Sequence, residues 1–454
     1  MDEFMHKTKK TNLSPWPNEI YSWYVVFVLC ICGMVAFIDR QIINLLVEDI
    51  KADLQVSDTQ ISLLQGLAFA LFYALAAVPL GRLADTSNRR RIIGLGIAVW
   101  TIAAASCGLA KSFLQLFIAR TFVGVGEATL TPSGFSMLAD LFKPHRLSLP
   151  LSVFTSSSFF GSGLALLVGG YLISQLGAMN EVSFPLLGIM HIWEAAFILG
   201  ALPGVIVAIL FFLTVREPVR RTSPLVLGNS QQVSQIDLEQ PSLSEVFNFM
   251  RAHSGIFMAV FGGVSLLAAV QFCLGAWVPA HFIRNYGWSA PEIGYAYGLI
   301  FLFCGTGGVI TGGWFADILQ SWGYRDGHLR VTLISALTAL PFVVFFPLMD
   351  TGNAAIILLA PTVFLGTMAF GAGPALIPVI CPPRMRGLLV SIYLLIANIV
   401  GQAGGPLIVA LFTDHVFGSP ELVRYSLVFA PAGLLLLGAF LISQGFRGFK
   451  EFVK

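Results

Sequence analysis

The chain consists of long apolar stretches separated by short polar segments. A helix of about 20 apolar residues crosses the roughly 30 Å hydrocarbon core of a bilayer, and an apolar run this long is typical of a membrane span. The pattern predicts an all-α polytopic membrane protein with six spans in each half. The predicted spans cover residues 22–46, 60–82, 92–110, 112–138, 148–173, 192–215, 254–281, 293–318, 331–349, 354–380, 388–412 and 422–443.

One longer polar stretch, residues 216–253, separates the two groups of spans. We predict that it is a linker, with a short amphipathic helix over residues 243–250. The remaining parts of this domain prediction are a tail over 1–21, a six-helix bundle over 22–215, a second six-helix bundle over 254–446, and a tail over 447–454.

The two halves contain an internal repeat. Residues 57–85 align without a gap with residues 289–317, and both segments end in Gly-x-x-x-Asp. The alternative is a chance match between apolar helices, but this alternative does not explain the duplicated glycine and acid. Two halves that are related by a parallel repeat predict a cavity at their interface and transport by rocking one half against the other.

Composition excludes a soluble globular protein, because 56% of the residues are apolar and only 11% are charged. The six cysteines lie in or beside apolar runs without paired spacing, and the histidines lack metal-ligand spacing. We therefore expect no disulfide framework, metal or cofactor, and no nucleic-acid partner. The polar N-terminal stretch lacks a cleavable signal, so the first span is expected to act as its own insertion signal.

Lysine and arginine are distributed unevenly between the predicted loops. Most fall on the side that contains both termini and the linker, whereas the other side has only Lys51, Lys111, Arg284 and Arg424. The positive-inside rule then places both termini in the cytoplasm. The short loops, without a glycosylation sequon on the outer side, favour a bacterial cytoplasmic membrane, and we expect a monomer.

Four charged residues lie inside predicted spans of the first half. Asp39 and Arg40 are in the first span, and Arg120 and Glu127 are in the fourth. A charge at the bilayer centre costs roughly 2.5 to 3.5 kcal/mol on insertion scales, so such residues are functional by default. Their depths predict an Asp39–Arg120 pair and allow Arg40 to approach Glu127. The repeat position of Asp39 is Gln271.

A static cluster that only joins two helices is one interpretation of these charges. We favour proton coupling, because a carboxyl group in a low-dielectric site can be neutral in one conformation and ionised in another. Asp39 and Glu127 are the expected proton carriers. Arg120 and Arg40 keep their charge and bias the protonation of these carboxyl groups.

The stretch GRLADTSNRRR ends the second span. Asp85 lies at the negative end of its own helix, where a carboxylate is disfavoured. Its expected partner is the helix start near Gly387 in the other half, and Gly81 allows close backbone approach. The second copy of this motif, Gly313 to Asp317, is expected to contact the helix start near Ser148. The predicted cytoplasmic gate therefore comprises Gly81, Asp85, Arg89, Arg90, Gly313 and Asp317. The alternative is that the arginines only keep this loop on the cytoplasmic side and that Asp85 is solvated.

These residues resemble a known family. Gly81, Leu83, Asp85, Arg89 and Arg90 are similar to the loop signature of the major facilitator superfamily, although the second copy lacks the basic cluster. The sequence ARTFVGVGEA resembles the fourth-span signature that this superfamily associates with proton coupling. FIDR at 37–40 together with Glu127 resembles the Spinster branch. The resemblance implies a transporter, not an enzyme, with lipid-like cargo such as sphingoid or lysophospholipid molecules.

The second half contains no full charge inside its spans but several polar and aromatic residues. These are expected to provide an apolar slot with a few hydrogen bonds: Gln271, Trp277, Tyr295, Tyr297, Tyr393 and Asn398. Ordinary helix packing is the alternative for each of them. Three other functions compete with lipid transport, namely proton symport of small organic anions such as sugar acids, reception without translocation, and, least favoured, an embedded enzyme.

Overall fold

The computed structural model describes residues 16–143, 146–179, 182–184, 188–220, 243–382 and 385–453. Within this part, 12 helical stretches are long and apolar enough to cross a membrane. Each overlaps one predicted span, so the all-α, twelve-span fold is confirmed. The predictions for residues 1–15 and for most of the linker, residues 221–242, concern residues outside the described part.

The first half contains the N-terminal spans. Its helices are α1 (Glu19–Leu45), α2 (Val47–Leu54), α3 (Asp58–Ser62), α4 (Ala68–Thr86), α5 (Arg89–Cys107), α6 (Phe113–Glu127), α7 (Leu130–Leu141), α8 (Ser148–Gly177) and α9 (Ile192–Thr214). Strands β1 (Val182–Phe184) and β2 (Gly188–Met190) form an antiparallel hairpin between α8 and α9, with Ser183 opposite Ile189.

The second half begins with α10 (Leu243–Ala252), which covers the short helix predicted at the end of the linker. Its other helices are α11 (Ser254–Phe257), α12 (Val264–Tyr286), α13 (Ala290–Ile300), α14 (Thr306–Ser321), α15 (Gly327–Phe345), α16 (Gly352–Ala372), α17 (Ile377–Ile380), α18 (Arg386–Ile396), α19 (Gly404–Leu411) and α20 (Val423–Val453). The tenth span ends at Ala372 and not at Ile380 as predicted. A 3₁₀ turn, Pro374–Leu376, interrupts it because proline has no N–H group to continue the helix.

Several spans contain a π-helical turn between two α-helical parts. These turns are Leu63–Leu67, Met258–Gly263, Phe301–Gly305, Ala397–Ala403 and, after α19, Phe412–Phe417. Short 3₁₀ turns are Phe346–Leu348 and Pro420–Leu422. π turns inside helices are frequent at functional sites, and three of these turns carry residues that line the cavity described below.

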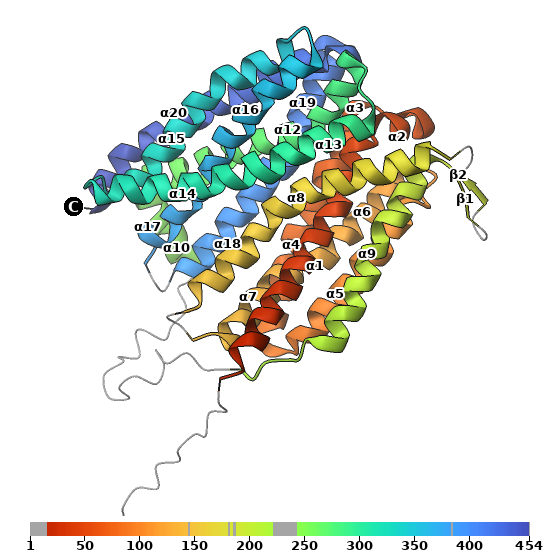
Figure 1. Cartoon of the computed structure of the whole chain (residues 1–454). Coiled ribbons are helices and arrows are strands. Elements are labelled where there is room, and N and C mark those ends of the chain that lie inside the picture. Colours follow the sequence, from red (N-terminus) through yellow and green to blue (C-terminus); the bar gives the residue numbers. More distant parts are fainter. Residues whose placement is uncertain are drawn as a thin grey trace, which may run out of the picture.

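The spans form two groups that meet along α8 and α13 (Figure 1). We call the side where α1 and α10 begin and α9 ends the linker side, and the opposite side, with α2, α3 and the hairpin, the far side. Glycines allow the close approach of α8 and α13. A Cβ added at Gly163 would lie 2.8 Å from the backbone oxygen of Gly298, and one at Gly294 would lie 3.1 Å from the Cα of Gly170.

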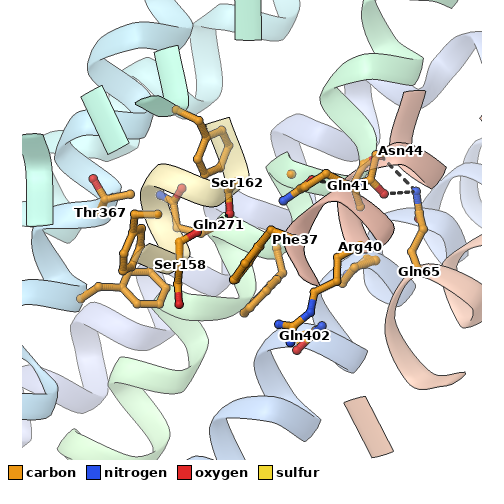
Figure 2. Close-up of a pocket in the computed structure, with 17 residues that line it drawn as sticks. Phe37, Arg40, Gln41, Asn44, Gln65, Ser158, Ser162, Gln271, Thr367 and Gln402 are labelled. Carbon is orange, nitrogen blue, oxygen red and sulfur yellow. Dashed lines mark hydrogen bonds between the residues drawn. The ribbon is translucent and has the colours of Figure 1, made fainter. Parts of the chain in front are cut away.

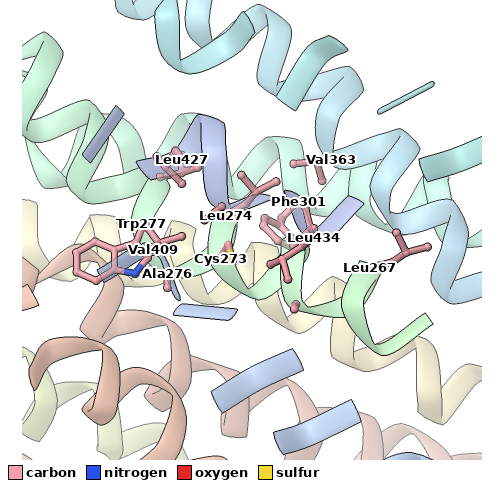
Figure 3. Close-up of a cluster of buried hydrophobic side chains, with 14 of the residues drawn as sticks. Leu267, Cys273, Leu274, Ala276, Trp277, Phe301, Val363, Val409, Leu427 and Leu434 are labelled. Atoms are coloured by element: carbon pink, nitrogen blue, oxygen red, sulfur yellow. The ribbon is translucent and has the colours of Figure 1, made fainter. Parts of the chain in front are cut away.

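The apolar core joins the halves on the far side. The larger buried cluster combines residues of the second half with Ile42, Leu46 and Ile61 of the first half; Figure 3 shows part of it around Trp277 and Cys273. A separate cluster, with Val28, Trp100 and other residues of the first half, lies nearer the linker side. Among the described residues, the buried cluster that combines both halves takes its first-half members from the far side, and one further ring pair, Phe159 with Phe370, also joins the halves.

Candidate transport site

A cavity of about 220 Å³ lies between the two halves (Figure 2). We call it the central cavity. The first half lines it with Phe37, Arg40, Gln41, Asn44, Gln65, Ser158, Phe159 and Ser162, and the second half with Gln271, Phe272, Gly275, Ala276, Phe301, Thr367, Phe370, Gln402 and Pro406. The predicted interface cavity is therefore present.

A second cavity of about 130 Å³, the N-terminal cavity, lies within the first half and is lined by Tyr73, Glu127 and Thr131 among others. Three residues, Phe37, Arg40 and Ser158, line both cavities. Arg40 therefore stands in the wall between the two spaces.

Arg40 forms an ion pair with Glu127. Its Nε donates to Oε2 of Glu127 at 2.7 Å, and its Nη2 donates to the same oxygen. The guanidinium group also lies 4.2 Å from the ring centre of Phe69 and 4.7 Å from that of Phe37, which are favourable cation–π distances. The Arg40 side chain is 21% exposed and that of Glu127 only 1%. The structure thus contains the Arg40–Glu127 contact that span depth allowed.

The predicted Asp39–Arg120 ion pair is wrong in this conformation. Nη1 of Arg120 donates to the backbone oxygen of Asp39 at 2.6 Å, and Nε donates to the backbone oxygen of Leu64 at 3.3 Å. Both residues are buried, and Oδ1 of Asp39 has no hydrogen-bond partner. Depth placed the two residues at the same height, but adjacent side chains on a helix point about 100° apart, so depth does not fix their direction.

The two carboxyl groups share one property. Oδ1 of Asp39 and Oε1 of Glu127 are buried and lack a hydrogen-bond partner. A protonated carboxyl group becomes a hydrogen-bond donor, whereas an ionised one only accepts. Each carboxyl group therefore has a buried oxygen at which a change in protonation changes the available hydrogen bonds.

Two of the predicted gate residues, Arg89 and Arg90, lie on the linker side and contact their own half. Arg89 is buried and binds Asp140 and Glu217, the latter at 2.8 Å. The backbone nitrogen of Arg90 donates to Glu217 at 2.8 Å, and its guanidinium donates to the backbone oxygen of Phe212.

The remaining gate residues form no bridge between described parts of the two halves. Nothing of the other half lies within 4 Å of a Cβ added at Gly81, nor at Gly313, and Asp317 is exposed. The side chains of Asp85 and Ser148 and the surroundings of Gly387 lie outside the described part. The gate therefore stays a prediction for a conformation that is closed on the linker side.

The far side, by contrast, contains charged contacts between the halves. Arg284 of α12 binds Asp58 through Nη1 and Nη2 at 2.7 and 2.8 Å, and Glu48 through Nε at 2.7 Å. Lys51 also binds Asp58. We call Glu48, Lys51, Asp58 and Arg284 the far-side ion cluster.

Two further contacts join the halves. Oδ2 of Asp414 accepts from both the backbone nitrogen and the hydroxyl of Thr59 at 2.7 Å. Nε2 of Gln65 donates to the backbone oxygen of Ala276 at 3.2 Å. Among interactions between described residues, every hydrogen bond and ion pair that joins the halves lies toward the far side. The conformation is therefore closed there.

Of the predicted slot residues, only Gln271 lines the central cavity. Trp277 is buried in the core, and its Nε1 donates to the backbone oxygen of Pro406 at 2.9 Å. Tyr393 packs against Phe261, and Tyr297 packs against Phe301. Asn398 donates to the backbone oxygen of Leu394 in its own helix, and Tyr295 is exposed away from the cavity lining. Helix packing accounts for Trp277, Tyr297 and Tyr393.

Sequence reasoning missed most of the cavity lining and the far-side ion cluster. The available signal for the lining was a set of uncharged amides inside apolar runs: Gln41, Asn44, Gln65 and Gln402. The available signal for the ion cluster was a basic residue, Arg284, at the far-side end of the seventh span, together with the acidic residues Glu48 and Asp58 in the first far-side loop. No group of three or more His, Cys, Asp or Glu among the described residues is placed to hold a metal ion.

Comparison with known proteins gives a consistent family assignment. A family model described as Major Facilitator Superfamily matches residues 29–406. An "MFS-type efflux pump" of Mycolicibacterium smegmatis is 28% identical over 423 residues, which cover 92% of this chain and 91% of the pump. Protein spinster homolog 1 of Homo sapiens is 25% identical over 425 residues, which cover 89% of this chain and 75% of that protein.

A solved structure matches almost the whole chain. A bacterial homologue of the human lysosomal transporter Spinster, in an inward-facing and unoccupied conformation, matches with a TM-score of 0.81 at 25% sequence identity. The match covers 96% of this chain and 99% of that chain.

Proposed function

Because the chain belongs to the Major Facilitator Superfamily, we propose that it is a proton-coupled secondary transporter that moves an amphipathic, lipid-like organic molecule by alternating access. Family membership makes it a multi-pass membrane transporter, as expected, and not an enzyme. Proton coupling and the lipid-like cargo are the proposed part.

The observation that carries the proposal is the position of the Arg40–Glu127 pair. Arg40 lines the central cavity. Glu127, which lines the N-terminal cavity, forms an ion pair with Arg40. An anionic group of the cargo competes with Glu127 for Arg40, and a proton on Glu127 releases Arg40 for the cargo. Cargo and proton therefore act on one side chain, so that the binding of one changes the affinity for the other, as coupling requires.

The cavity lining supports an amphipathic cargo. Five phenylalanines share the central cavity with amides, hydroxyls and Arg40. Ligand sites are commonly apolar surfaces with a small number of placed polar groups that fix orientation. This combination suits a molecule with an apolar tail and a polar head, as the Spinster resemblance implies.

The orientation of the chain follows from charge. The linker side has most of the lysines and arginines, so we assign it to the cytoplasm together with both termini. The conformation closed on the far side is then inward-facing, in agreement with the matched Spinster homologue. We further assign the protein to a bacterial inner membrane as a monomer.

Uptake into proteoliposomes tests the coupling. Glu127→Gln and Asp39→Asn should abolish accumulation of a lysophospholipid driven by a pH gradient, because neither amide can take up a proton. Exchange of labelled for unlabelled cargo at equal pH should persist, which shows that the variants are folded. Glu421→Gln, an exposed carboxyl at the far side, is the matched control and should behave as wild type.

Uphill accumulation that survives in both variants would rule out coupling at these carboxyl groups. Competition by a hydrophilic sugar acid, with no effect of a lysophospholipid, would favour the small-anion alternative instead.

A further inference from the structure

Five carboxamide side chains line the central cavity, and they come from both halves: Gln41, Asn44, Gln65, Gln271 and Gln402. Figure 2 shows them on opposite sides of Phe37 and Arg40. Gln65, Gln271 and Gln402 are each only 7% exposed. Arg40 is the only charged residue in the lining that the structure describes.

Much of the hydrogen-bonding capacity of these amides is unused. Asn44 donates to Gln41 at 2.8 Å and accepts from Gln65 at 3.0 Å. Oε1 of Gln65 and Oε1 of Gln271 have no partner, and the Gln402 side chain makes no hydrogen bond to another described residue. A carboxamide offers two donor hydrogens and an acceptor oxygen. Buried polar groups are normally paired, and leaving them unpaired is unfavourable, so these amides point to a ligand.

Two of the three hydroxyl groups in the lining, those of Ser162 and Thr367, already donate to a partner. Ser162 donates to the backbone oxygen of Ser158 at 2.9 Å, and Thr367 donates to that of Val363 at 2.9 Å. Both hydroxyls are bound to their own helices. The amides, together with the Ser158 hydroxyl, therefore remain the polar groups in the lining with free capacity for recognition.

The chemistry of the amides restricts the ligand. A hydroxyl group donates and accepts, as a carboxamide does, whereas an ammonium only donates and a phosphate or carboxylate oxygen only accepts. Several hydroxyl groups satisfy adjacent amides better than one charge does. Arg40 adds a site for one anionic group.

We infer that the central cavity selects a polyhydroxylated anion, that is, several hydroxyl groups next to one phosphate or carboxylate. The inference rests on the proposed transport function and specifies the polar part that the cargo presents to the central cavity. Two sources have this chemistry, the glycerol phosphate head of a lysolipid and a free sugar acid. A cavity of about 220 Å³ accommodates either, with a lipid tail remaining outside it.

Binding to the purified full chain in nanodiscs, followed by quenching of intrinsic tryptophan fluorescence, tests the inference with two matched pairs. Lysophosphatidylglycerol is compared with lysophosphatidylpropanol of the same acyl chain, and gluconate with hexanoate. Within each pair the members differ in their hydroxyl groups but keep the anion. The hydroxylated member of at least one pair should bind about tenfold more tightly or better, since each buried hydrogen bond contributes about that factor. The pair that shows the preference identifies the source.

Variants connect the preference to the amides. Gln271→Met and Gln402→Met keep the side-chain length and should each reduce the preference about tenfold, without weakening the member of each pair that has fewer hydroxyl groups. Asn398→Leu is the matched control, because Asn398 lies in the same turn as Gln402 but binds its own helix.

Equal affinity within both pairs, a preference that survives both glutamine variants, or no binding of any probe would overturn the inference. Equal affinity within the lipid pair together with pH-driven lipid uptake would leave the proposed function intact.

Discussion

Arg284 is the single residue on which closure of the far side depends most directly. Its side chain is 4% exposed and lies between Asp58 and Glu48 of the other half. Removing one partner of a buried ion pair costs about 3 to 5 kcal/mol, because the remaining charge stays buried. In this protein that cost applies only to states in which the halves meet on the far side.

Arg284→Gln should therefore shift the population toward states that are open on the far side. Spin labels on the two halves at the far side should report longer distances in nanodiscs. Arg330→Gln is the matched control, because Arg330 pairs with Asp326 four residues away in sequence and in the same half. An unchanged distance distribution in a folded Arg284→Gln protein would show that the far-side ion cluster does not hold this state.

Single residues also show how far sequence reasoning reaches. The depth of a residue in the membrane follows from counting residues from the end of its span. This correctly placed Arg40 near Glu127, and Arg120 at the same depth as Asp39. The direction of a side chain depends on how the helix is rotated, which packing decides. For this reason Arg120 binds the backbone of Asp39, and Trp277 lies in the core. Gln271, found by the repeat, was placed correctly in the cavity.

At the scale of elements, the contact between α8 and α13 determines whether the far side can close. Their backbones meet where both helices carry glycine, at Gly163 beside Gly298 and at Gly170 beside Gly294. Small residues permit this approach in a membrane, where dispersion contacts replace the hydrophobic effect between helices. A larger side chain at the contact must separate the helices.

Gly163→Leu should hold α8 away from α13 and lower the population closed on the far side. Transport should fall strongly, because one of the two alternating states is lost. The matched control is Gly177→Leu at the end of the same helix, where nothing lies within 4 Å of an added Cβ. Cysteine labelling from the far side measures the effect. Equal labelling of the Gly163→Leu and Gly177→Leu proteins would contradict this role of the contact.

The elements were predictable to the extent that hydropathy defines them. Twelve apolar runs gave twelve spans, since each run must cross the bilayer as a helix to satisfy its backbone. The π turns were not predictable, because an extra residue in a turn is decided by neighbouring helices. This matters at the site: Gln65, Phe301 and Gln402 all lie in such turns. The far-side helix α2 and the β1–β2 hairpin were missed because they are too short to produce a hydropathy signal.

At the scale of the whole molecule, the two halves share a core and charged contacts on the far side, whereas the described gate residues of the linker side contact only their own half. This is one of the two states that alternating access requires. The equilibrium between them responds to any group with a different free energy in each state. We propose that Glu127 and Asp39 have that role, since both are buried here with one unpaired oxygen each.

The most direct test compares carboxyl protonation in the two states by infrared difference spectroscopy. The protein is locked by cysteine cross-links, in one sample across the far side and in the other across the linker side. The account predicts a change in the carboxylic-acid band between the two samples that disappears in the Glu127→Gln, Asp39→Asn double variant. Identical carboxyl spectra of the two locked wild-type samples would contradict it.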